Sequence, residues 1–115
     1  MKKPGQIVLF TFPKVDQVRG KLRPVLLLGK LPGPYDDWLV CMISSQLRHY
    51  TEGFDEIIDE SSSDFAHSGL KTPSVIRIGR LAVVEEHMLL GSIGEIAPER
   101  LRRIKTNLVA WLTNA

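Results

Sequence analysis

Two segments of the sequence carry side chains that suit phosphate binding, and each lies next to a short apolar run. Arg23 and Pro24 come directly before the apolar run 25–28. Ser44, Ser45 and Gln46 come directly after the apolar run 38–43. A planar guanidinium can present two N–H groups to a phosphate, while hydroxyl and amide groups add hydrogen bonds to its oxygens. These residue types predict a metal-free site for a polyanion. The alternative is a structural ion pair of Arg23, with the two serines simply ending a strand.

An antiparallel hairpin would bring these two segments together. Proline disfavours helical backbone in the residue before it, so Pro24 favours an extended conformation for Arg23. If the runs 25–28 and 38–43 pair around a turn near Gly33, Arg23 lies beside Ile43 and Ser44. The pairing of run 7–12 with run 25–28 puts the connection between them at the same end of the sheet.

That connection is part of a basic segment. Residues 1–23 hold six lysines and arginines against one acid, Asp16. Such a cluster is typical of a phosphate-binding surface, although a solvated loop would look the same. We therefore predict that polyanion binding at this rim involves Ser45, Gln46 and three basic side chains of the connection, Lys14, Arg19 and Lys21.

The histidines are candidates for a general base but not for a metal site. His49, His67 and His87 show no H-x-x-x-H spacing. A hydrolase triad built on Ser44 is disfavoured because the chain has no G-x-S-x-G nucleophile motif. The sequence predicts no metal and no cofactor.

Two further features favour structural roles. Residues 91–94 match the G-x-x-G letters of a nucleic-acid clamp, but convincing flanking helices are absent and a turn is expected. Cys41 lies inside an apolar run and is expected to be a buried, inert thiol.

The elements that position these residues are mostly short strands. Apolar, β-branched runs bounded by Gly and Pro predict strands at 7–12, 25–28, 38–43, 54–58, 74–78 and 81–84, with a short helical turn within 85–90. The run 38–43 is apolar throughout, as in a central strand. From Pro98 the pattern changes to a helical period with Leu101, Ile104, Leu108, Trp111 and Leu112 on one face. This order predicts a small, mostly antiparallel β-barrel with a C-terminal α-helix.

Length and composition agree with one folded domain over residues 1–115. A chain with 43% hydrophobic and 24% charged residues is neither disordered nor membrane-like. No apolar run reaches the roughly 18 residues of a membrane span, and no signal-peptide core follows the basic start. A single cysteine excludes an internal disulfide framework. We expect a soluble cytoplasmic protein.

At several of these positions the chain resembles the MazF/PemK-like toxins, and in particular the PemK-like branch. The resemblance extends from about Pro4 to Leu112, and its individual motifs are modest but occur in the family's order. They are Gly5-Gln6-Ile7-Val8, Lys21-Leu22-Arg23-Pro24-Val25-Leu26, Ile43-Ser44-Ser45-Gln46, Ser68-Gly69-Leu70-Lys71, Ser74-Val75-Ile76-Arg77 and Ile93-Gly94-Glu95-Ile96.

The resemblance implies a compact SH3-like β-barrel, usually a homodimer, that serves as the toxin of a bacterial type II toxin–antitoxin system. It implies a metal-independent, sequence-specific endoribonuclease that cuts single-stranded RNA by attack of the ribose 2′-hydroxyl. The family's catalytic Arg and Thr correspond to Arg23 and Ser44, and its gating loop corresponds to residues 14–22. The implied partner is a cognate antitoxin, and such partners often carry an acidic, disordered segment.

Three departures from the family pattern leave other functions open. Gln6 replaces the usual Asp, Ser44 replaces Thr, and residues 52–64 hold six acids without any Lys or Arg, which would repel RNA near its groove. A guanidinium is also a poor base near neutral pH, so His49 or His67 is a candidate for the missing base. The alternatives are a non-catalytic RNA- or protein-binding module on the same barrel, and a gyrase-targeting poison of the same fold.

Overall fold

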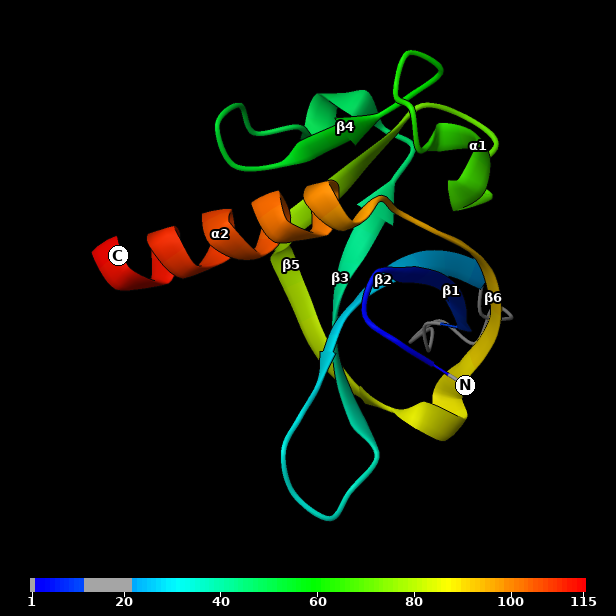
Figure 1. Cartoon of the computed structure of the whole chain (residues 1–115), viewed down its shortest axis with the longest axis vertical. Coiled ribbons are helices and arrows are strands. Elements are labelled where there is room, and N and C mark those ends of the chain that lie inside the picture. Colours follow the sequence, from blue (N-terminus) through cyan, green and yellow to red (C-terminus); the bar gives the residue numbers. More distant parts are fainter. Residues whose placement is uncertain (1, 12–21) are drawn as a thin grey trace, which may run out of the picture.

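Strands dominate the structure, and one long helix follows them. The computed structural model describes residues 2–11 and 22–115. Within these residues the chain forms β1 (Gln6–Thr11), β2 (Leu22–Lys30), β3 (Asp37–Ser44), β4 (Glu56–Ile58), β5 (Ser74–Glu85) and β6 (Leu89–Glu95) (Figure 1). The helices are the 3₁₀ turns η1 (Leu47–His49) and η2 (Glu86–Met88), the single turn α1 (Phe65–Ser68) and the terminal helix α2 (Pro98–Asn114).

The described strands form one antiparallel sheet in the order β4-β5-β3-β2-β1-β6. Strand β3 pairs with both β2 and β5, which confirms that its apolar sequence marks an interior strand. Strands β4 and β6 are the edges of the described sheet, so the barrel-like sheet is open along its hydrogen-bonded order. The predicted antiparallel β-structure with a C-terminal helix is confirmed.

Each face of the sheet has its own apolar core, because successive strand residues point to opposite faces. Helix α2 covers one face, and its Ile104 and Leu108 pack with Leu26, Cys41 and Ile76. The buried Cys41 thiol agrees with the sequence interpretation, and burial raises its pKa to about 12. The second core lies on the opposite face and is made of strand residues. It includes Phe10, Val25, Leu27, Trp38, Val40, Val84 and Leu89.

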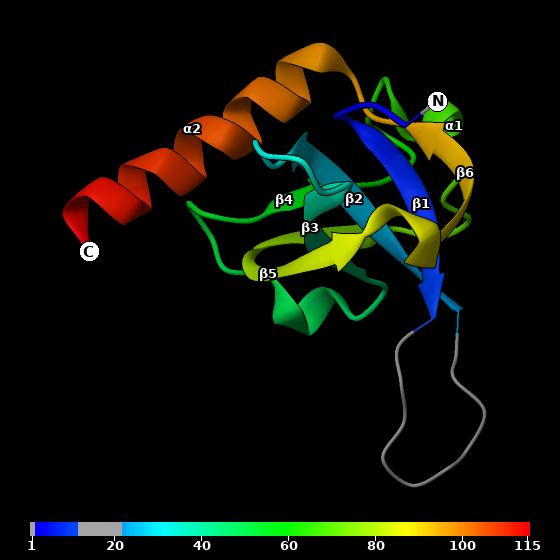
Figure 2. The same cartoon turned by 90° about the horizontal axis from the view of Figure 1, so that it is seen from below.

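Helix α2 begins at Pro98, as predicted, but its last turns extend past the sheet (Figures 1 and 2). The sequence places Trp111 and Leu112 on the same face of the helix as Ile104 and Leu108, a face that either the barrel or a partner could cover. Trp111 and Leu112 are 53% and 59% exposed, because the sheet beneath the helix ends before the helix does. No helix among the described residues is both long and apolar enough to cross a membrane.

Two predicted boundaries differ from the structure. The segments 74–78 and 81–84 were expected as separate strands, yet β5 runs continuously through them. A register shift absorbs the interruption: Cys41 pairs with Leu81, whereas Met42 pairs with Arg77. A β-bulge therefore lies near Gly79, where the sequence predicted a turn between two strands.

The segment 91–94 is also not a turn but part of β6. Its Gly94 lies against α1, and a Cβ there would stand 2.2 Å from the His67 carbonyl oxygen. Gly69 has a φ of +76° and would place a Cβ 2.0 Å from the Ile93 carbonyl oxygen. Gly69 and Gly94 permit close packing between α1 and β6, which accounts for the second glycine of the G-x-x-G letters without any ligand.

Buried ion pairs join the start of α2 to the acidic segment. The Arg100 guanidinium donates to both carboxylate oxygens of Asp64 at 2.8 and 3.0 Å, and to Glu56 at 2.9 Å. Asp64 also accepts from the Ala97 N–H at 3.0 Å, next to the first turn of the helix. Asp55 accepts from the Ile78 N–H at 3.0 Å. Much of the acidic segment therefore serves to hold α2 and β5 in place.

Candidate functional site

Strands β2, β3 and β5 bring three polar residues to one end of one sheet face. Arg23 and Ser44 were predicted from the sequence, and Arg77 was not. Val25 pairs with Met42, and Met42 pairs with Arg77, so these three residues share a face. Arg23 and Ser44 lie two residues further along β2 and β3 toward the same end, and alternation puts them on that face as well. The opposite face carries α2.

The hairpin register is close to the one predicted. The sequence placed Arg23 beside Ile43 and Ser44, and the observed pairs Val25–Met42 and Leu26–Cys41 continue toward Arg23 opposite Ser44. Arg23 is exposed, whereas Ser44 is half-buried at the end of its strand. An exposed guanidinium thus stands across from a half-buried hydroxyl.

The segment after β3 folds back over Ser44. The Gln46 N–H donates to the Ser44 Oγ at 3.0 Å, and the Arg48 guanidinium donates to the Gln46 side-chain oxygen. Ser45 is exposed beside them. The predicted binding residues Ser45 and Gln46 therefore lie at the site, although the Gln46 amide oxygen already has a partner.

The predicted contributions of Lys14, Arg19 and Lys21 lie outside the described residues. Strands β1 and β2, which flank that connection, pair through Phe10–Arg23 and Thr11–Leu22. The two ends of the connection are thus at the same end of the sheet as Ser44, as the sequence analysis expected.

His49 lies directly against Ser44. Its Nδ1 is 2.8 Å from the Ser44 Oγ, and η1 packs on β5. Partial burial lowers the pKa of His49, and the positive charges of Arg77, Arg48 and Arg80 lower it further. His49 is therefore a neutral imidazole near pH 7, and the charged side chains that influence it are arginines.

Sequence analysis missed these three arginines as site residues. A signal was present for Arg77, since it is a charged residue inside the otherwise apolar run 75–78 and must face away from the core. Arg48 and Arg80 gave no such signal, because their placement depends on η1 and on the bulge in β5. His67 lies in α1, packed toward β6, and His87 lies in η2, near the opposite end of β3.

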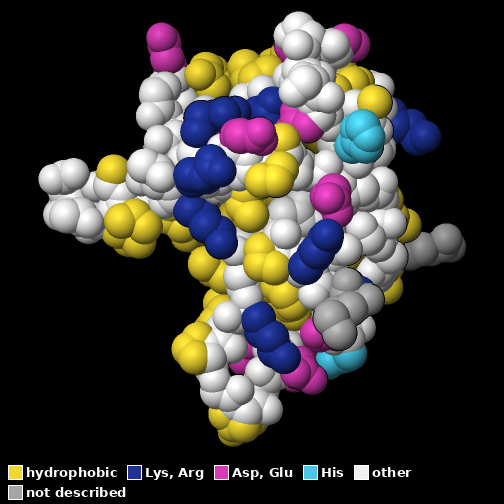
Figure 3. Space-filling view, viewed as in Figure 1, with side chains coloured by type: hydrophobic (Ala, Val, Ile, Leu, Met, Phe, Trp, Pro, Cys, Tyr) yellow, Lys and Arg dark blue, Asp and Glu magenta, His cyan; other side chains and the backbone are white. Residues whose placement is uncertain are grey.

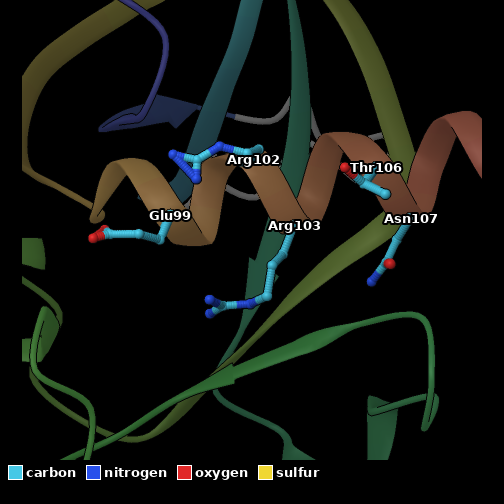
Figure 4. Close-up of a pocket in the computed structure, with 5 residues that line it drawn as sticks. All are labelled: Glu99, Arg102, Arg103, Thr106 and Asn107. Atoms are coloured by element: carbon cyan, nitrogen blue, oxygen red, sulfur yellow. The ribbon is translucent and has the colours of Figure 1, made fainter.

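Two hollows of the described surface lie away from Arg23 and Ser44. One of about 320 Å³ lies along α2, where Arg103 and Asn107 point toward β4 (Figure 4). Another, of about 390 Å³, is lined by residues that include Tyr35, Glu86 and His87. Neither of these two hollows is lined by Arg23 or Ser44. Among the described residues, no group of three or more His, Cys, Asp or Glu side chains is placed to hold a metal ion.

Solved structures similar to this chain are MazF proteins and an endoribonuclease. A MazE–MazF complex from Deinococcus radiodurans has a TM-score of 0.70 at 19% identity, over 99% of this chain and 97% of that one. Toxin MazF-mt6 from Mycobacterium tuberculosis has a TM-score of 0.63 at 20% identity, over 91% and 93%. A mycobacterial endoribonuclease in complex with its cognate antitoxin has a TM-score of 0.66 at 14% identity, over 98% and 96%. These likenesses establish the fold.

Family membership follows from the sequence. No curated protein sequence matches the chain significantly. The family model of the PemK-like, MazF-like toxins matches residues 3–112, which is nearly the whole chain and includes every candidate site residue named above. The chain therefore belongs to the PemK-like, MazF-like toxins of type II toxin–antitoxin systems.

Proposed function

We propose that this toxin is an endoribonuclease that cleaves single-stranded RNA through Arg23 and Ser44, without a metal ion. The observation that carries the proposal is the convergence of Arg23, Ser44 and Arg77 at one end of one sheet face. The similarity to a mycobacterial endoribonuclease supports the reaction class.

The chemistry follows from what these side chains donate. When the ribose 2′-oxygen attacks the adjacent phosphorus, negative charge builds on the nonbridging phosphate oxygens. The Arg23 guanidinium offers paired N–H donors to those oxygens, and β3 positions the Ser44 hydroxyl next to the reacting group. Arg77 adds a second positive charge on the same face. The reaction then leaves a 2′,3′-cyclic phosphate and a 5′-hydroxyl.

We also propose that the toxin is a homodimer neutralised by a cognate antitoxin. Val109, Trp111 and Leu112 leave an apolar surface on the protruding end of α2, which a second copy would cover. The similar MazE–MazF and endoribonuclease–antitoxin complexes support an antitoxin partner. An acidic antitoxin segment would suit the arginines around Ser44, since it competes for the charges that bind RNA.

The test is cleavage of a long single-stranded RNA of mixed sequence in EDTA. We expect wild-type protein to give discrete cuts with cyclic-phosphate ends, and Arg23→Ala to give none. Arg102→Ala is the matched control, because Arg102 is an exposed arginine of α2 and therefore belongs to the other side of the sheet.

Each other outcome has a defined meaning. Cleavage by folded Arg23→Ala at the wild-type rate would refute the role of Arg23. RNA binding without cuts by the wild type would make the protein a non-catalytic binding module. If the wild type neither binds nor cuts RNA, the next assay is gyrase inhibition.

A further inference from the structure

The contact between Ser44 and His49 has a geometry that suits proton transfer. The Ser44 Oγ and the His49 Nδ1 are 2.8 Å apart, within the range of a strong hydrogen bond. The η1 turn sets this distance: the His49 N–H donates to the Gln46 carbonyl oxygen at 3.0 Å, and the Gln46 N–H donates to the Ser44 Oγ at 3.0 Å. Two backbone hydrogen bonds thus hold the imidazole over the hydroxyl.

The Ser44–His49 contact can pass a proton from the hydroxyl to the imidazole. The Gln46 N–H occupies one lone pair of the Ser44 Oγ, which leaves the hydroxyl its own proton and one further lone pair. In the neutral tautomer with its hydrogen on Nε2, the His49 Nδ1 accepts the Ser44 proton. The proton transfer from Ser44 to His49 requires this tautomer.

The charges around His49 keep its imidazole unprotonated near pH 7. Arg77 and Arg80 act from β5, and Arg48 acts from η1 itself, so the groups that surround the imidazole are cationic. Partial burial acts in the same direction on the pKa. The neutral form therefore persists below the pH at which an ordinary histidine becomes charged.

We propose that His49 is the positioning residue that accepts the Ser44 proton during RNA cleavage, so that Ser44 can take the proton of the ribose 2′-hydroxyl. The inference rests on the proposed ribonuclease function and adds the proton acceptor that Arg23 and Ser44 lack. His67 and His87 lie on other elements, whereas His49 contacts Ser44 directly.

The proton transfers balance over one turnover. The 2′-hydroxyl proton moves to the Ser44 Oγ while the Ser44 proton moves to the His49 Nδ1. The freed electron pair of the 2′-oxygen forms a bond to phosphorus, and the bond from phosphorus to the 5′-oxygen breaks. The 5′-oxygen takes a proton from water, and the resulting hydroxide takes the proton from His49.

His49→Asn separates proton transfer from simple positioning. The Asn Oδ1 can accept the Ser44 hydrogen bond near the place of Nδ1, but it cannot take up a proton. His67→Asn is the matched control, because it makes the same change in α1. The measurement is kcat/KM for cleavage of a mixed-sequence RNA in EDTA, from about pH 5 to about pH 9, around the titration range of imidazole. Thermal unfolding checks that each variant is folded.

The expected profile for wild type and His67→Asn rises with pH and reaches a plateau, with its midpoint below the ordinary imidazole value of about 6.5. His49→Asn should lose about 100-fold or more at the plateau and should lose the acid limb. Imidazole NMR of the wild type should show His49 titrating at the midpoint of that limb, a result that does not depend on how any variant folds.

Three results would overturn the inference. They are a His49→Asn rate close to wild type, an acid limb that persists in His49→Asn, and a His49 titration at or above the ordinary value. If wild type cuts and Arg23→Ala does not, any of these refutes the role of His49 alone. If the wild type does not cut RNA at all, the proposed function and this inference fail together.

Discussion

The buried ion pairs of Arg100 predict a large loss of stability in the variant Arg100→Ala. The Arg100 side chain is 9% exposed and that of Asp64 is 7% exposed, so the pair has little contact with water. Removing Arg100 takes away two of the three hydrogen bonds that the Asp64 carboxylate accepts from Arg100 and Ala97, and leaves the one from the Ala97 N–H. Breaking such a pair from one side costs roughly 3–5 kcal/mol.

The lower part of that range is expected, because Glu56 keeps a second partner. Arg103 donates to Glu56 at 3.0 and 3.3 Å, and the Arg103 side chain is 54% exposed. We therefore expect the free energy of unfolding to fall by about 3 kcal/mol in Arg100→Ala. Arg103→Ala should cost about 1 kcal/mol or less, as for other exposed pairs.

Urea unfolding of the wild type, Arg100→Ala and Arg103→Ala measures these differences. Arg102→Ala serves as the control for loss of an exposed arginine from the same helix, with an expected change within about 0.5 kcal/mol. If Arg100→Ala is no less stable than Arg102→Ala, the reasoning from burial is wrong.

The pH dependence gives an independent check. Burial alone would raise the pKa of Asp64, but the hydrogen bonds from Arg100 and the Ala97 N–H, with the Arg100 charge, hold it below its usual 3.8. A lowered carboxyl pKa gives stability that is present above 3.8 and is lost as the pH falls toward the folded-state pKa. The difference between wild type and Arg100→Ala should therefore narrow below about pH 4. A constant difference would mean that Asp64 is not the group responsible.

Three further predictions concern the site, the packing of α1 and the end of α2. Ser44→Ala should lower kcat/KM by a factor equivalent to about 1–3 kcal/mol while Ser44→Thr stays near wild type, and equal rates for both would remove the hydroxyl from the mechanism. Gly94→Ala should cost about 1–3 kcal/mol in thermal unfolding, whereas Gly91→Ala, where a Cβ meets nothing within 4 Å, should be nearly neutral. Trp111→Ala should weaken the proposed dimer in sedimentation while costing the fold only about 1 kcal/mol for the lost ring contact with Phe54, whose centroid is 6.3 Å away; an unchanged dimer would place the interface elsewhere.

Much of the fold was predictable because the relevant signals are local. The apolar run 38–43 marked an interior strand, and Pro98 marked the start of α2. The two halves of β5 were separated wrongly, because Gly79 gives the same local signal in a bulge as in a turn. The strand β6 was missed because Gly91 and Gly94 look like turn residues, whereas Gly94 is required by its contact with α1, which lies far away in sequence.

The candidate site divides in the same way. Placing Arg23 near Ser44 required only a hairpin register, which a turn between two apolar runs largely determines. The choice between His49 and His67 as a candidate base could not be made from spacing, because it depends on the backbone hydrogen bonds of η1. Side chains that come together through a 3₁₀ turn and a bulge leave no periodic signal.

The acidic segment 52–64 was the strongest argument from sequence against RNA binding. In the structure, three of its carboxylates make structural hydrogen bonds or ion pairs. Asp55 accepts hydrogen bonds from the backbone of β5 and of Thr51, while Glu56 and Asp64 bind arginines of α2. Figure 3 shows acidic side chains beside Lys and Arg side chains over α2. Since α2 covers the face opposite Arg23 and Ser44, Glu56 and Asp64 are paired with arginines away from the candidate site, and the charges that lower the pKa of His49 at that site are arginines. An acidic run in a sequence therefore does not by itself exclude polyanion binding, because the fold can pair some of its acids on another face.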